Sequence, residues 1–113
     1  MYGNVIDSAT DNIPTTFTTA AGSRVISSSS SGGFLGIINY TSDTLAVVVG
    51  NYQDTAVPVS TLPGRCVFIP FAPSGSNGSA AMDYFKVSQG DSVFIRATGG
   101  SAITSGKVFV FVK

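Results

Sequence analysis

The chain alternates between short apolar runs and polar segments rich in Gly, Ser, Thr and Asn. Runs of about four to eight residues bounded by turn formers are typical of β-strands. No window places apolar residues at the i, i+3, i+4, i+7 spacing of an amphipathic helix. The pattern predicts about eight short strands, at residues 13–20, 24–27, 34–39, 44–50, 66–71, 82–87, 92–97 and 108–112.

The segments between these strands indicate how the strands are arranged. Tight turns are predicted at residues 40–43 and 88–91, whereas the stretches at 51–64 and 72–81 are long crossings that contain Gly, Ser and Pro. An up-and-down meander would have uniformly short turns, so the long crossings favour two packed sheets. We expect an all-β fold, a jelly-roll-like antiparallel β-sandwich formed by a single domain at residues 13–113.

Residues 1–12 are mostly polar and contain the isolated aliphatic residues Val5 and Ile6. We interpret this segment as an extended N-terminal arm outside the sandwich, which reaches a neighbouring molecule. A frayed terminus is the alternative, because chain ends are often loose unless they dock. Pro14 then limits the first predicted strand, residues 13–20, to a sheet edge or a strand start.

The last two predicted strands, residues 92–97 and 108–112, flank a loop of small residues, and this order is typical of a hairpin. Successive side chains of a strand point to opposite faces of the sheet. Phe109 and Phe111 therefore share one face, opposite the valines of the same strand. Phe94 likewise lies opposite the aliphatic residues of its strand. If the aliphatic faces share a core, the three Phe residues pair across the hairpin on the other side.

These Phe residues admit two interpretations, and the sequence leaves both open. A large exposed apolar patch marks an interface with a partner, but the chain's own loops or arm could equally cover the same side chains. Under the first interpretation, the candidate interface residues come from the arm and the last two strands. They are Tyr2, Val5, Ile6, Phe94, Phe109 and Phe111.

Composition favours a protein that works in an assembly. Charged residues make up 11% of the 113 residues, against about 25% in a typical domain. The formal net charge is zero, so little electrostatic repulsion keeps copies of the protein apart. The same balance argues against a nucleic-acid-binding protein, which would carry a basic patch. No apolar stretch approaches the ~20 residues of a membrane span. The first residues lack a secretory pattern, so we expect synthesis in the cytoplasm.

Candidate catalytic chemistry is sparse. The chain has no His, so neither a Ser nucleophile nor Cys66 has the usual base. The available acids are Asp residues, and Asp43 and Asp91 occur in turns, where Asp normally accepts hydrogen bonds from nearby backbone N–H groups. Zinc requires several His or Cys ligands, and calcium requires clustered carboxylates. We therefore expect no enzyme activity, no catalytic residues, no cofactor and no metal.

Several strand and turn segments carry a resemblance to a known family. They are IINYT at 37–41, LAVVV at 45–49, PG at 63–64, QGDSVFI at 89–95 and TSGKVFV at 104–110. Over roughly residues 34–112 the chain resembles the capsid decoration, or cement, proteins of tailed bacteriophages, which have a jelly-roll fold. The resemblance implies no catalytic residues.

The resemblance implies a protein made in the host cytoplasm and located on the outer capsid surface of the virion. There it would bridge major capsid proteins, and it would associate with copies of itself as a dimer or trimer. The alternative is a tail, fibre or spike module that binds a partner protein or a glycan. In that case Tyr40, Tyr52, Tyr84 and residues 72–81 would matter.

Overall fold

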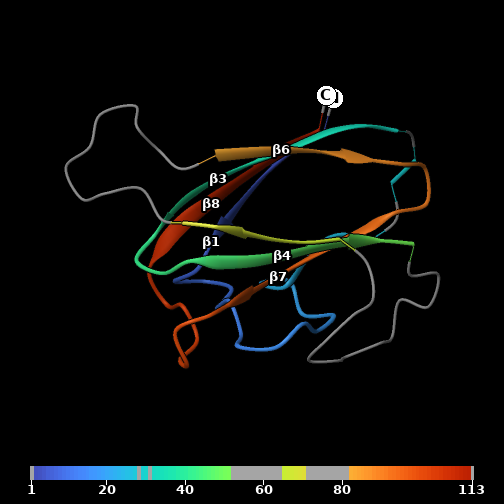
Figure 1. The fold of residues 1–113 in the computed structure, drawn as a ribbon. Helices are drawn as coiled ribbons and strands as arrows, with labels where there is room; N and C mark the ends of the chain where they lie inside the picture. The colour runs from blue at the N-terminus through green and yellow to red at the C-terminus, as the bar shows by residue number, and fades with distance from the viewer. Residues whose placement is uncertain (1, 28, 31, 52–64, 71–81, 113) are drawn as a thin grey trace.

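The computed structural model describes residues 2–27, 29–30, 32–51, 65–70 and 82–112. These residues form eight strands and no helix. The strands lie in two four-stranded sheets, with the orders β1-β8-β3-β6 and β2-β7-β4-β5, stacked face to face (Figure 1). Their bounds are β1 Tyr2–Asp7, β2 Arg24–Ile26, β3 Gly33–Thr41, β4 Leu45–Gly50, β5 Arg65–Ile69, β6 Met82–Val87, β7 Ser92–Ala97 and β8 Gly106–Val112.

The strand pairing is that of one long hairpin rolled up on itself. β1 pairs with β8, β2 with β7, β3 with β6 and β4 with β5, all antiparallel. Rolling brings β3 against β8 and β4 against β7, which completes the two sheets. This is the order of a jelly roll. The predicted antiparallel, jelly-roll-like β-sandwich of eight short strands is thus confirmed.

Consecutive strands share a sheet only in the case of β4 and β5. The predicted hairpin of residues 92–97 and 108–112 is therefore wrong, because β7 pairs with β2 and β4 whereas β8 pairs with β1 and β3. The loop between them crosses from one sheet to the other, and its residue Ile103 forms a β-bridge with Ile13. Small turn residues suit a hairpin and a crossing equally well, so the turn sequence did not distinguish the two.

The N-terminal segment also differs from the expected arm. β1 pairs with β8 along its whole length, from Tyr2 opposite Val112 to Asp7 opposite Lys107, and the side chain of Ile6 is only 3% exposed. An edge strand needs to bury only one face, so one inward aliphatic residue suffices to anchor it. Residues 13–20, predicted as the first strand, form no strand; Ile13 makes a single β-bridge with Ile103, and Phe17 also occupies a bridge position.

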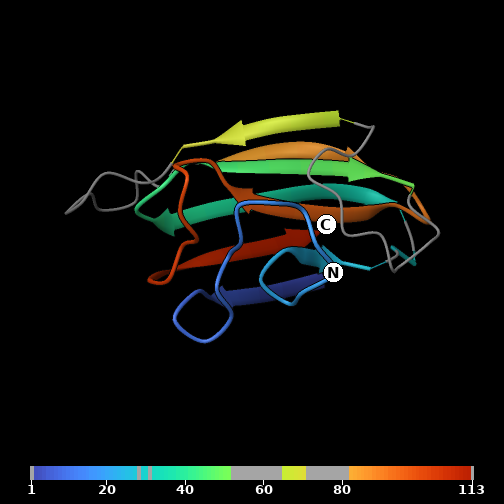
Figure 2. The same ribbon diagram turned by 90° about the horizontal axis from the view of Figure 1, so that it is seen from below.

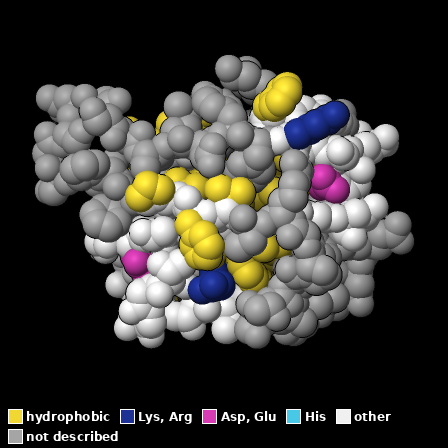
Figure 3. All heavy atoms as spheres, viewed as in Figure 1, with side chains coloured by type: hydrophobic (Ala, Val, Ile, Leu, Met, Phe, Trp, Pro, Cys, Tyr) yellow, Lys and Arg dark blue, Asp and Glu magenta, His cyan; other side chains and the backbone are white. Residues whose placement is uncertain are grey.

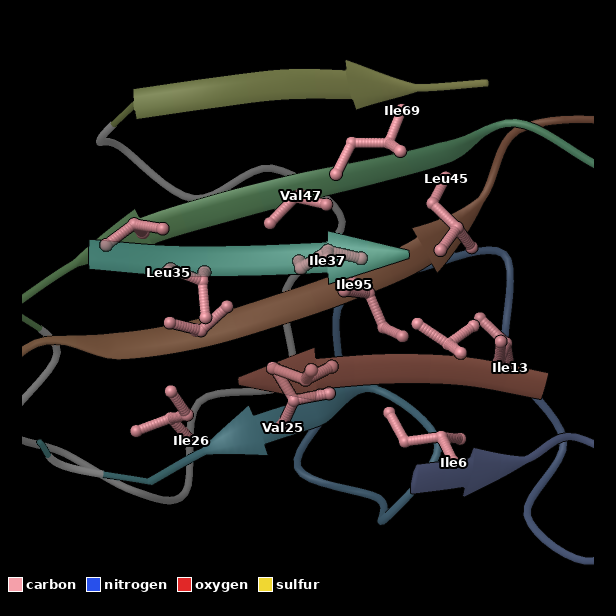
Figure 4. Close-up of a cluster of buried hydrophobic side chains, with 14 of the residues drawn as sticks. Ile6, Ile13, Val25, Ile26, Leu35, Ile37, Leu45, Val47, Ile69 and Ile95 are labelled. Carbon is pink, nitrogen blue, oxygen red and sulfur yellow. The ribbon is translucent and has the colours of Figure 1, made fainter. Parts of the chain in front are cut away.

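The core lies between the sheets and is almost entirely aliphatic (Figure 4). Leu35 and Ile37 of β3 face Val47 of β4 and Ile95 of β7, and each of these side chains is fully buried. Complete burial of one such side chain stabilises the fold by about 1.5–3 kcal/mol. The inner faces of the alternating strands thus account for the stability of the sandwich.

A buried polar residue, Asn39, borders this core at the end of β3. Asn39 is 0% exposed, and its Nδ2 donates to the carbonyl oxygens of Asp43 at 2.8 Å and Ile69 at 3.1 Å. Its Oδ1 accepts from the backbone N–H of Thr41 at 3.0 Å. Buried amides require such partners. Asn39 therefore ties β3 in one sheet to β5 in the other and fixes the turn before β4.

Candidate interaction surface

Each sheet has an outer face that points away from the core, and the connection between β1 and β2 covers one of these faces. Residues 8–23 run below β7, on the outer side of the β2-β7-β4-β5 sheet (Figures 1 and 2). The N–H of Ala97 in β7 donates to the carbonyl oxygen of Pro14 at 2.8 Å. The Ser23 hydroxyl donates to the carbonyl oxygen of Ile95 at 2.8 Å. These bonds hold the connection against β7.

Phe17 belongs to this connection, and its side chain packs into a second, smaller apolar cluster. The cluster consists of Phe17 at 3% exposure, Ala46 at 0%, Val48 at 1% and Phe94 at 1%. The guanidinium carbon of Arg96 lies 5.4 Å from the centroid of the Phe17 ring, a cation–π arrangement. The outer face of this sheet is therefore closed over Phe94 by the chain itself.

The outer face of the β1-β8-β3-β6 sheet carries an apolar row across three strands. Val5 of β1 stands opposite Phe109 of β8, which stands opposite Ile38 of β3. Residues directly opposite in antiparallel strands share a face. Phe111 follows Phe109 on the same face of β8, and Gly36 of β3 lies opposite Phe111.

Large side chains on this face remain accessible. Val5 is 50% exposed, Phe34 57% and Tyr40 45%, and Ile38, Phe109 and Phe111 are partly exposed. The rings of Tyr40 and Phe109 meet edge to face with centroids 5.6 Å apart, an arrangement that holds both rings in place. We call these six residues the outer apolar surface: Val5, Phe34, Ile38, Tyr40, Phe109 and Phe111.

Three charged residues border the outer apolar surface. Lys107 of β8 stands opposite Tyr40 of β3 on one side and opposite Asp7 of β1 on the other. Lys86 of β6 stands opposite Phe34 of β3. Figure 3 shows one side of the molecule, on which the charged side chains of the described residues are scattered and hydrophobic side chains are exposed among them. Exposed hydrophobic residues that gather on one face mark an interaction site more often than scattered ones do.

The structure separates the residues predicted as interface candidates. Val5, Phe109 and Phe111 lie together on the outer apolar surface. Ile6 points into the core, and Phe94 lies under Phe17 in the other sheet, so neither presents a surface to a partner. The proposed pairing of the three Phe residues across a hairpin is wrong, because β7 and β8 belong to different sheets. Tyr2 belongs to β1, and its side chain lies outside the described part of the structure.

Phe34 and Ile38 were missed as candidates, and Tyr40 was named only for the glycan-binding alternative, although the sequence held a signal for all three. Phe34, Ile38 and Tyr40 alternate along β3 with the buried residues Leu35 and Ile37. This strand is thus apolar on both faces, the same property that drew attention to residues 108–112. The shared signal of this face is therefore the apolar character of both faces of β3 and β8.

Three Asp residues support turns. Asp43 accepts hydrogen bonds from the N–H of Thr44 and of Gly99, each at 2.8 Å. Asp91 accepts from the N–H of Ser88 at 2.9 Å, and Asp7 accepts from the N–H of Ala9 at 3.1 Å. The predicted turn roles of Asp43 and Asp91 are confirmed. Asp43 also joins the turn after β3 to the loop after β7.

Two further features are absent from the described residues. No group of three or more His, Cys, Asp or Glu side chains lies close enough to hold a metal ion within the described ranges. The part of the chain that the structure describes has no helix of the length and hydrophobicity needed to span a bilayer. Comparison with known proteins found no matching family model and no matching curated sequence.

Proposed function

We propose that this protein is a non-enzymatic structural component of a bacteriophage virion. It binds the outer surface of the capsid and stabilises the shell by bridging major capsid proteins. The observation that carries the proposal is the outer apolar surface, which occupies one sheet face of a jelly roll and is bordered by Asp7, Lys86 and Lys107. The resemblance to decoration proteins gives the partner its identity.

The energetics of decoration suit such a surface. A protein that binds only the assembled shell stabilises that shell by mass action and needs contact area, not catalysis. A specific interface buries about 800 Å² on each partner, and the whole accessible surface of this molecule is 5726 Å². One sheet face of a small sandwich can supply this share. Low charge limits the number of ions that must be desolvated on binding.

Capsid shells assembled from the major capsid protein of the same genome test the proposal. The protein should co-sediment with these shells and raise their resistance to heat and pressure. The chain offers a matched pair of variants, because Phe34 and Phe68 are 57% and 60% exposed on opposite sheets. Phe34→Ser should weaken binding about tenfold, the effect of losing a contact worth about 1.4 kcal/mol.

Phe68→Ser should bind the shells as the unmodified protein does, since it lies on the other sheet. Shells that neither bind the protein nor gain resistance would refute the proposal. Binding by Phe34→Ser that equals binding by Phe68→Ser and by the unmodified protein would show that binding does not use the outer apolar surface.

A tail, fibre or spike module is the second candidate function, favoured by the exposed ring of Tyr40. Sugar rings stack on exposed aromatic faces, so this function predicts binding to a glycan array that Tyr40→Ala abolishes. Tyr52, Tyr84 and residues 72–81, named with Tyr40 as candidates for this function, have side chains outside the described residues. A glycan array without binding, together with binding to capsid shells, would decide for decoration.

A further inference from the structure

β1 forms a free edge of its sheet, visible as the lower strand in Figure 2. In antiparallel pairs, residues alternate between those whose backbone groups bond to the neighbour and those whose groups point away from it. The N–H of Ser8 donates to the carbonyl oxygen of Gly106 at 3.1 Å, and this bond fixes the alternation. The backbone groups of Asn4 and Ile6 are therefore directed to β8, and those of Gly3 and Val5 point outward.

Outward-pointing backbone groups of β1 remain available for pairing. The carbonyl oxygen of Asp7 is already used, since it accepts from the N–H groups of Thr10 and Asp11 at 3.0 and 2.9 Å. Among the described residues, no backbone group outside β8 bonds to Gly3 or Val5. Unpaired groups along a strand edge are a template for another strand.

Of the sheet edges, β1 has the fewest features that block such pairing. β2 is only three residues long and carries a register shift. β6 has the exposed Lys86, and β5 begins with Arg65 and is followed by Pro70. Short strands, bulges, Lys and Pro are the devices that protect edges. β1 has an uninterrupted six-residue register, and its one charge, Asp7, stands at its end.

We propose that β1 pairs antiparallel with β1 of a second copy of this chain, with Val5 opposite Val5. The Val5 N–H of each copy donates to the Val5 carbonyl of the other, and the Asp7 N–H donates to the Gly3 carbonyl. A two-fold axis generates this contact, which uses the same surface on both copies. The two sheets become one continuous sheet across the dimer.

Charge and the side-chain pattern identify the occupant as a second copy. The Val5-centred register places Asp7 opposite Gly3, so no like charges meet, and the zero net charge leaves little repulsion between copies. Val5 is 50% exposed on the outer face, and this register brings the two Val5 side chains together. The outer apolar surfaces of both copies thereby join into one surface.

Sedimentation equilibrium of the tag-free protein over a concentration series tests the proposal. A single edge strand buries less than the ~800 Å² per partner of a standard interface, so we expect a dimer with a micromolar dissociation constant. Amide exchange gives a site-specific readout, because the Val5 N–H becomes protected only as the dimer forms. A protein that stays monomeric at all concentrations refutes the proposal.

Two variants probe the edge without touching the bonds to β8. Val5→Pro removes an outward N–H and should weaken dimerisation more than about tenfold. Val5→Lys keeps the N–H but places like charges opposite each other in the dimer, so it should also give monomers. If the proline variant does not fold, the lysine variant alone tests the pairing of β1 with β1. Phe34→Lys adds the same charge away from the edge and should dimerise normally.

Unchanged dimerisation of Val5→Lys would refute the pairing in this register. Dimers that survive in Val5→Pro as well would place the interface elsewhere on the molecule. These measurements use the purified protein alone. Their outcome is therefore independent of whether the protein binds capsid shells.

Discussion

Replacing Phe17 with alanine tests whether the connection between β1 and β2 closes the outer face of the β2-β7-β4-β5 sheet. Phe17 is 3% exposed and packs on Phe94, Val48 and Ala46. No strand includes Phe17, so its contribution comes from this packing and from Arg96 above its ring. Phe17→Ala removes the ring and leaves the covered apolar face open to water.

The cost follows from the burial of the ring. A buried Phe→Ala substitution destabilises by about 3–5 kcal/mol, and sites that can collapse fall at the low end. The connection can settle onto the sheet, so we take about 3 kcal/mol and add about 0.5–1 kcal/mol for the lost contact with Arg96. Phe68 is 60% exposed on the same sheet, so Phe68→Ala should cost less than about 1 kcal/mol.

Urea unfolding followed by circular dichroism measures both costs. Typical stabilities of about 5–15 kcal/mol leave the Phe17→Ala protein mostly folded at 25 °C, and the midpoint should fall without a change in slope. Amide exchange adds a local readout. The N–H of Ala97 donates to the carbonyl of Pro14, so its protection should drop if the connection lifts from β7.

Equal destabilisation by Phe17→Ala and Phe68→Ala would refute the reasoning. It would mean that Phe17 does not close the sheet face, and that the burial of Phe94 has another cause. A normal free energy of unfolding with lost protection at Ala97 would instead show that docking of the connection and stability of the sandwich are uncoupled.

Two other substitutions test the ends of the strands. Gly106 has φ +94°, and a Cβ there would lie 2.6 Å from a backbone oxygen of β3, whereas Gly100 has φ +89° and nothing within 4 Å of a Cβ. In thermal unfolding, Gly106→Ala should therefore cost about 2–4 kcal/mol and Gly100→Ala about 1–2 kcal/mol. Equal shifts for the two variants would contradict the close contact at Gly106. Asn39→Ala leaves the buried carbonyl of Ile69 without its donor and should cost about 2–3 kcal/mol in urea, whereas Asn4→Ala at an exposed position should be near neutral.

Alternation of apolar residues predicted most strands correctly, but it could not assign the strands to sheets. Residues 34–39 and 44–50 were predicted to be joined by a tight turn, without an assignment to sheets, and they belong to opposite sheets. A short turn permits either outcome. The sheet to which each strand belongs depends on which later strand pairs with it. β8 pairs with β3, and β7 pairs with β4. Those pairings join residues far apart in the chain, where local patterns carry no information.

The N-terminal strand was missed for a related reason. Val5 and Ile6 are adjacent, so in a strand they point to opposite faces, and neither face of the segment shows an apolar row by itself. The row exists only across strands, where Val5 meets Phe109 and Ile6 meets Val108. Edge strands held by one neighbour need little pattern of their own, which makes them the hardest elements to predict from local sequence.

Phe94 and Phe109 show why the candidate surface needed the structure. Each lies in an apolar strand, on the face opposite the core. What distinguishes them is Phe17, which covers Phe94 from a segment that local patterns did not connect with β7. The sequence left open whether the Phe residues would be covered by the chain or by a partner. The structure shows that Phe94 is covered by the chain, whereas Phe109 is partly exposed.

Under the proposed function, this difference places stability and association on separate faces of the same sandwich. Loss of Phe17 should lower the free energy of unfolding and leave shell binding intact at temperatures where the protein is folded. Loss of Phe34 should weaken shell binding and cost little stability, because its side chain is already 57% exposed. Exposed apolar area costs free energy that only a partner can recover. A protein whose stability and association responded together to both substitutions would not use its two faces in this way.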